Sequence, residues 1–176
     1  LEIQTATSTR LVLDKPWILP STSLLSAPPS KSHSQARIKQ QAQIIVDTLS
    51  NAGIEVELGE RPNIGPAVTQ FALKLNDSNK LTKIGTMGQI LAYALAAPTG
   101  QIRIEAPIPG KTLVGIEVPN DQIETVGLRT LLESNNMRNN DNPTTVGLGK
   151  DLSGEALSYE LARMPHLLIA GTTGSG

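Results

Sequence analysis

The first regular pattern of apolar and polar positions begins at Gln35 and has the period of an α-helix. Its apolar residues recur every three or four positions, so they lie along one stripe of a helix, opposite a polar side. They are Ile38, Ala42, Ile45, Leu49 and Ala52. Gly53 follows, and a glycine just past the last turn is a common helix end. The pattern predicts an amphipathic helix that ends at Gly53.

Two pairs of segments with a period of two follow this helix. Residues 54–58 alternate apolar and polar, and residues 67–75 do so again after a turn that contains Pro and Gly. Residues 102–105 and 113–118 repeat the arrangement around a second turn. Alternation places the apolar side chains on one face of a strand, so each pair predicts a half-buried β-hairpin.

Apolar positions at helical spacing lie between and after the two hairpins. A stripe from Leu81 to Leu95 predicts a second helix, which Ser78 or Asn79 can cap. Residues 123–132 predict a short third helix. The order helix, hairpin, helix, hairpin, helix over residues 35–143 therefore predicts a small α+β layer domain with one sheet.

The segment before this domain, residues 1–34, is rich in Ser, Thr and Pro and predicts a linker. Its prolines block a helix. It also carries several apolar residues, namely Trp17, Leu19, Leu24 and Leu25. A fully solvated tether has no use for them, so we expect one extended stretch of the linker to dock on the domain that follows.

Residues 144–176 predict the opening of a different domain. Two short strands, 144–149 and 157–161, precede the continuous apolar run 167–170, which predicts a strand buried on both faces. A glycine-rich loop comes next, and its first and last glycines are four residues apart, as in the first six positions of the phosphate-binding loop pattern Gly-x-x-x-x-Gly-Lys-Ser/Thr. The residues predicted to bind phosphate are Gly171, Thr172, Thr173, Gly174, Ser175 and Gly176.

Composition narrows the choice of function. The 15 Lys and Arg residues against 16 Asp and Glu give a net charge of −1, so no global basic field marks a free-standing nucleic-acid binder. The chain has no Cys and only 2 His, which excludes a disulfide framework and a thiolate metal site. No segment has the pattern of a membrane span or a signal peptide. We expect a cytoplasmic location, which includes the cytoplasmic side of a membrane-anchored protein.

Five blocks in the same order resemble the motor region of the FtsK/SpoIIIE family of bacterial DNA translocases. They are Gly65-Pro66-x-Val68-Thr69-x-Phe71, the stretches 102–111 and 114–120, Leu148-Gly149-Lys150-Asp151, and the stretch 164–176. The resemblance implies an FtsK-type α domain at about 35–143 and the opening strands of a RecA-like P-loop NTPase (β) domain at 144–176. It also implies a homohexameric ring that hydrolyses ATP with Mg²⁺ and moves double-stranded DNA during chromosome segregation and cell division, with membrane contact only through other regions.

The resemblance places the phosphate-loop Lys, the carboxylates that hold Mg²⁺, the arginine finger and the DNA-contacting loops after Gly176. We therefore expect the 176 residues by themselves to be catalytically inactive, although the resemblance implies that the intact protein is an ATPase. No catalytic residue and no metal ligand is predicted within this sequence.

Two other classes of function compete with this interpretation. Gly85-Thr86-Met87-Gly88 fits the Gly-x-x-Gly loop with which KH modules clamp a single-stranded nucleic acid, and a helix break at 85–88 would favour that class. The α domain could instead be a non-catalytic oligomerisation collar. Individual charged residues also have plain structural explanations: Arg103 and Lys111 as solvated hairpin charges, Glu105 and Glu117 as cross-strand partners, and His166 as a structural residue.

Overall fold

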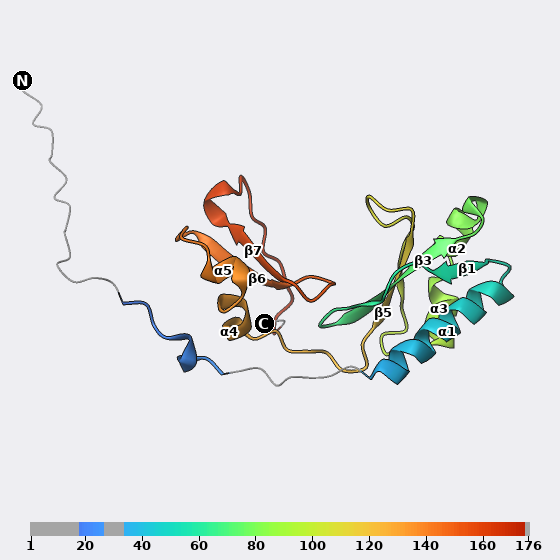
Figure 1. Cartoon of the computed structure of the whole chain (residues 1–176), viewed down its shortest axis with the longest axis horizontal. Helices are drawn as coiled ribbons and strands as arrows, with labels where there is room; N and C mark the ends of the chain where they lie inside the picture. Colours follow the sequence, from blue (N-terminus) through green and yellow to red (C-terminus); the bar gives the residue numbers. More distant parts are fainter. Residues whose placement is uncertain (1–17, 27–33, 175–176) are drawn as a thin grey trace, which may run out of the picture.

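The computed structural model describes residues 18–26 and 34–174, which form two lobes joined by residues 120–127 (Figure 1). The first lobe, residues 34–119, contains three helices and a five-stranded antiparallel sheet. The second lobe, residues 128–163, contains two short helices and a two-stranded sheet. This is a mixed helix and sheet architecture, as predicted.

The sheet of the first lobe is built around one long central strand. Its strands are β1 (Val56–Leu58), β2 (Asn63–Ile64), β3 (Val68–Leu75), β4 (Arg103–Glu105) and β5 (Val114–Pro119). The order is β1-β3-β5-β4, and β2 pairs with β3 on the same side as β1. Both predicted hairpins form: Val56 lies opposite Leu75, and Ile104 lies opposite Ile116.

The helix α1 (Gln35–Asn51) packs its apolar stripe on one face of this sheet. Ile45 and Leu49 are fully buried against the core that also contains Phe71 of β3 and Ile116 of β5. The helix ends as predicted, because Gly53 adopts the left-handed conformation (φ +73°) and the N–H of Ile54 donates to the carbonyl of Leu49.

The predicted second helix is divided into two. A 3₁₀ turn, η2 (Ser78–Lys80), leads into α2 (Leu81–Gly85), and α3 (Gly88–Ala94) follows after a break at Thr86 and Met87. The cap is Asp77, whose carboxylate accepts the N–H of Asn79 at 2.9 Å, and not the predicted Ser78 or Asn79. A substituent Cβ on Gly88 would lie 2.9 Å from the carbonyl oxygen of Ile102, so the break brings α3 close to the backbone that enters β4.

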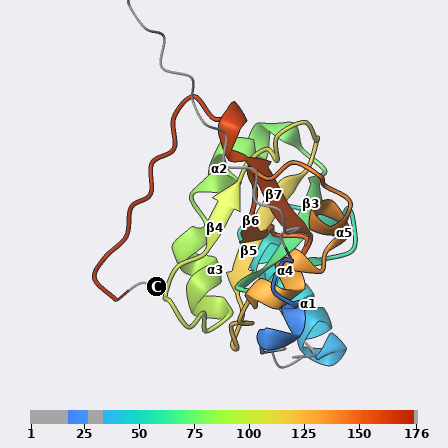
Figure 2. The same ribbon diagram turned by 90° about the vertical axis from the view of Figure 1, so that its left-hand side faces the viewer.

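The predicted third helix lies in the second lobe and not on the five-stranded sheet. It forms as α4 (Leu128–Leu132), and α5 (Asn135–Arg138) follows; both pack on the antiparallel pair β6 (Thr145–Lys150) and β7 (Ala156–Glu160) (Figure 2). The lack of a side chain at Gly147 makes room for α4, because a Cβ there would lie 3.2 Å from Leu131 Cβ. The two strands predicted after Pro143 are thus present as a hairpin.

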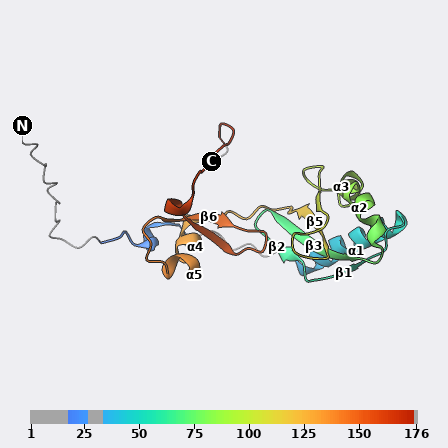
Figure 3. The same ribbon diagram turned by 90° about the horizontal axis from the view of Figure 1, so that it is seen from above.

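The described part of the linker docks on the second lobe. The turn η1 (Thr22–Leu24) lies beside α4 (Figure 3), and the hydroxyl of Thr22 donates to Glu133 Oε1 at 2.8 Å. This hydrogen bond, followed by that from Arg129, lowers the pKa of Glu133. Docking was predicted on apolar grounds; Leu19 and Leu24 are mostly exposed, Leu25 is partly buried, and the hydrogen bond from Thr22 adds a polar contact. Trp17 lies outside the described residues.

The core of the first lobe yields a test with a matched control. Phe71 is fully buried, whereas Tyr93 on α3 is 90% exposed. We expect Phe71→Ala to lower the free energy of unfolding by about 3–5 kcal/mol, because it leaves a large cavity, whereas Tyr93→Ala should change it by less than about 0.5 kcal/mol. Denaturant unfolding followed by circular dichroism measures both values; equal losses would contradict the assignment of the core.

Candidate nucleotide-binding segment

The segment predicted to bind phosphate follows the second lobe directly. After β7 and the turn η3 (Leu161–Arg163), residues 164–174 contain no helix and no strand, and Figure 3 shows them projecting from the second lobe. Leu168 and Ile169 are 90% and 86% exposed. The prediction of a buried strand at 167–170 is therefore wrong for this structure.

The physical reason lies in backbone hydrogen bonding. A strand needs a neighbour that pairs with its N–H and C=O groups, since unpaired backbone groups are costly to bury. β6 and β7 pair with each other, and none of the described strands pairs with residues 167–170. Without a partner strand, residues 167–170 form no regular structure here and remain exposed.

The glycine-rich loop is described only in part. Gly171, Thr172, Thr173 and Gly174 are exposed, and Ser175 and Gly176 lie outside the described residues. Gly174 has a φ of +82°, a conformation that residues with a Cβ rarely adopt. No hydrogen bond of the described residues uses the backbone N–H groups of 171–174. These donors are thus available for an anion, which fits a phosphate ligand; the six-residue assignment itself stays a prediction.

A shallow cavity of about 460 Å³ adjoins the start of this segment. Its walls include Tyr159, Arg163 and His166. Arg163 is paired with Glu160 at 3.1 Å. His166 is exposed and has no strand beside it, so the structural role predicted for it from a neighbouring buried strand has no basis here.

The turn between β6 and β7 is held by one carboxylate. Asp151 Oδ1 accepts the hydroxyl of Ser153 at 2.6 Å and the backbone N–H groups of Ser153 and Glu155 at 2.8 and 3.0 Å. The hydrogen bond from the Ser153 hydroxyl is the main cause that lowers the pKa of Asp151, and the backbone donors add to it. Gly154, with a φ of +82°, completes the turn.

Most charged side chains of the two hairpins in the first lobe are paired within the chain. Arg103 lies 3.4 Å from Glu117, its cross-strand neighbour, and 4.0 Å from Glu105 on its own strand. The prediction of a cross-strand partner is confirmed for Glu117 and wrong for Glu105, which lies opposite Gly115. Lys111 contacts Glu60 at 2.7 Å. These pairings account for the charges structurally, without a nucleic-acid ligand.

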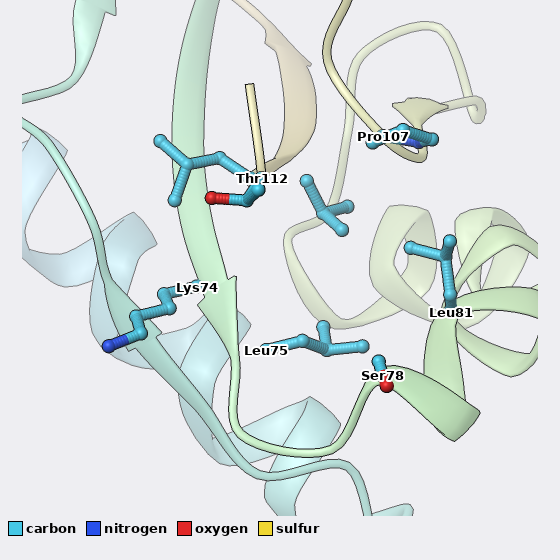
Figure 4. Close-up of a pocket in the computed structure, with 8 residues that line it drawn as sticks. Lys74, Leu75, Ser78, Leu81, Pro107 and Thr112 are labelled. Carbon is cyan, nitrogen blue, oxygen red and sulfur yellow. The ribbon is translucent and has the colours of Figure 1, made fainter. Parts of the chain in front are cut away.

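A second cavity, of about 300 Å³, lies in the first lobe between the end of β3 and the loop that joins β4 to β5 (Figure 4). Its lining is mostly apolar, and Figure 4 shows the nitrogen of Lys74 pointing away from the other labelled side chains. Convergent polar groups mark ligand sites, and this cavity has none. In the described part of the chain, no group of three acidic, His or Cys residues could hold a metal ion.

The KH alternative can be judged from the backbone at 85–88. The helix does break there, which was the criterion in its favour, and the expected continuous helix is wrong. However, the N–H groups of Thr86 and Met87 donate to Lys83 and Ile84, and the Met87 side chain is 4% exposed. A clamp loop must offer its backbone to a ligand, so this turn is a core-packed bend between two helices.

Sequence reasoning missed the polar residues that join the turns of the first lobe. Asn120 accepts the hydroxyl of Thr69 at 2.8 Å and donates to the carbonyl of Gly65 at 2.9 Å. In the sequence, Asn120 follows a Pro at the end of a predicted strand. That position indicated the end of the strand but not the hydrogen bonds that Asn120 makes.

Comparison with known proteins assigns the chain to a family. Residues 19–120 match the model of the FtsK alpha domain, and residues 127–176 match that of the FtsK/SpoIIIE family. The two models follow one another along most of the sequence. The chain therefore belongs to the FtsK/SpoIIIE family.

Several curated relatives carry the name DNA translocase FtsK. The chain is 44% identical to that of Streptococcus pyogenes serotype M1 over 160 residues, which is 90% of this chain and 20% of the relative. It is 44% identical to that of Caldanaerobacter subterraneus over 157 residues, 89% of this chain and 22% of the relative. For Staphylococcus aureus strain Mu50 the identity is 41% over 161 residues, 91% and 20%. The chain thus spans about a fifth of the length of these relatives.

The Asp151 turn predicts a pH dependence. A carboxylate whose pKa is lowered by folding contributes stability that is present above its unfolded pKa and is lost as the pH falls through its folded pKa. We expect Asp151→Ala to destabilise the second lobe near neutral pH by on the order of 1 kcal/mol and to flatten its loss of stability as the pH falls below the ordinary pKa of an Asp side chain. Acid titration followed by circular dichroism and amide chemical shifts tests this.

Asp141 provides the control for this titration. It is exposed, and among the described residues it makes no hydrogen bond or ion pair. Asp141→Ala should leave the acid titration unchanged, and an equal effect of both substitutions would refute the role of the Asp151 turn.

Proposed function

We propose that the intact protein is an ATP-driven double-stranded DNA translocase of the kind used in chromosome segregation and cell division. The observation that carries the proposal is the match to both family models in succession, together with relatives named DNA translocase FtsK at 41–45% identity. The glycine spacing of residues 171–176 supports it independently, because it is the opening of a phosphate-binding loop.

In this proposal the backbone of residues 172–176 binds the phosphates of ATP. Backbone N–H groups that are free of internal hydrogen bonds are suited to a polyanion, and Gly174 already has a left-handed conformation that permits close approach. Thr172 and Thr173 contribute through their N–H groups. ATP, bound with Mg²⁺, supplies the phosphoryl group whose hydrolysis drives movement; the ligands of Mg²⁺ are not among these residues.

The remaining parts of the proposal concern organisation. The division into a linker (1–34), an FtsK-type α domain (35–143) and the start of a RecA-like ATPase domain (144–176) stays a prediction. Since α4 and α5 pack on β6 and β7, contacts favour a boundary within 120–127. We further propose a homohexameric ring around DNA on the cytoplasmic side, with any membrane contact made by other regions. No described helix combines the length and apolar character that crossing a membrane requires.

An oligomerisation collar is the second candidate for the first lobe. It is supported by the internal pairing of the hairpin charges of that lobe. A collar is compatible with the translocase, because it concerns the role of one part of the same ring.

The phosphate loop can be tested in the intact protein. We expect Gly176→Val to abolish DNA-stimulated ATP hydrolysis, with a loss of at least about 100-fold, because a side chain there displaces the phosphates from their donors. Thr172→Val keeps the backbone donor and removes only a hydroxyl, so it serves as the control and should retain most of the rate. Wild-type hydrolysis by the Gly176→Val protein would overturn the assignment.

The 176-residue chain gives a complementary prediction. Because the free loop must be ordered by its ligand, and because no Lys or Mg²⁺ ligand of the motif is present in it, we expect no ATP turnover and only weak nucleotide binding. Millimolar ATP should leave the thermal midpoint of unfolding unchanged, since stabilisation requires a ligand concentration well above Kd. A clear upward shift would contradict the prediction.

A further inference from the structure

The two lobes meet at a close contact between two turns. The turn of the β6–β7 hairpin points at the turn between β2 and β3 (Figure 1). A Cβ added to Gly65 would lie 3.0 Å from the carbonyl oxygen of Leu152, and one added to Gly154 would lie 3.5 Å from that of Ile64. Two glycines therefore allow the backbones of the lobes to touch.

An ion pair lies next to this contact. Lys150 Nζ, at the end of β6, is 3.2 Å from Glu124 Oε1 in the connecting segment. The two side chains are 18% and 25% exposed, and among the ion pairs of the described residues this is the only one in which neither side chain exceeds a quarter exposure. Reduced solvation makes such a pair stronger than a surface pair, and removal of one partner costly.

Glu124 is itself fixed to the first lobe. Its backbone N–H donates to the carbonyl of Pro66 at 2.7 Å. The turn around Pro66 is held in turn by Asn120, which donates to Gly65 and accepts from Thr69, while its N–H donates to Ala67 at 2.9 Å. The anionic partner of Lys150 is therefore bonded to the turn before β3, which Asn120 ties to the end of β5.

We propose that Lys150 and Glu124 are positioning residues that fix the second lobe on the first. The contact between the two turns is small, and lobes joined by a small interface are expected to move relative to one another unless something holds them. The partly buried ion pair supplies that hold. Because β7 leads through η3 into the segment 164–174, the same pair sets where that segment leaves the second lobe relative to the first lobe; the bearing of this on phosphate binding rests on the proposed function.

Distance measurement tests the joint without any nucleotide. The chain has no Cys, so spin labels can be attached to cysteines introduced at exposed Lys39 on α1 and exposed Asn139 after α5. The parent protein should give a narrow distribution of label distances. In Lys150→Glu, or the less disruptive Lys150→Met, part of the population should leave the distance seen in the parent protein. The ratio of molecules at the parent distance to molecules at other distances should fall by about tenfold, as expected on loss of a partly buried charge pair.

Two controls keep this test sharp. The exchange Glu124→Lys with Lys150→Glu restores opposite charges and should recover the narrow distribution. Lys111→Glu makes the same change of charge in an ion pair inside the first lobe and should have no effect on the distances. A narrow, unchanged distribution in the Lys150 variants, or failure of the exchange to recover it in a protein that remains folded, would overturn the proposal.

The intact protein separates this inference from the proposed function. If the role of the ion pair and the translocase function are both correct, Lys150→Met should retain DNA-stimulated ATP hydrolysis but move fewer base pairs of DNA per ATP. The charge exchange should restore the number of base pairs moved per ATP. If the Lys150 variants alter the label distances but the intact protein shows no DNA-dependent activity, the role of the ion pair between the lobes is supported and the proposed translocase function is refuted. If the label distances change but the number of base pairs moved per ATP stays normal, the ion pair has no role in coupling ATP hydrolysis to DNA movement.

Discussion

Strand β3 is the element on which the first lobe depends, because its backbone is hydrogen-bonded on both sides. β1 and β2 pair along one edge and β5 pairs along the other. Its side chains then divide between the two faces, with Phe71 and Leu73 directed to the helices and Gln70 to the opposite face beside Glu117. Pairing fixes the register, and the register decides which residues are buried. Helices α1, α2 and α3 cover the apolar face that results.

The same requirement explains the state of residues 167–170. Their apolar sequence is typical of a central strand of a parallel sheet, but a central strand exists only between two others. In the described structure β6 and β7 pair only with each other, and residues 167–170 form no ladder with either strand. The apolar pattern thus indicates that residues 167–170 are suited to a buried strand. Whether they form one depends on the presence of partner strands.

Sequence patterns predicted well what short-range physics determines. The helix end at Gly53 and the two hairpins follow from local conformation and alternation. The break at Thr86 and the placement of α4 depend on contacts with residues far away in the sequence, Ile102 and Gly147, which periodicity does not contain. For the candidate site, glycine spacing indicated the phosphate loop, whereas Lys150 and Glu124 became a pair only through the fold.

The docking of η1 on α4 has a mechanical consequence. Residues 18–26 and residues 164–174 both adjoin the second lobe, although the chain between them passes through the first. A pulling force applied between these two segments is borne initially by the second lobe and by the hydrogen bond from Thr22 to Glu133. As long as this hydrogen bond holds, the force is not transmitted through the five-stranded sheet. The contact between η1 and α4 therefore breaks before the sheet is loaded.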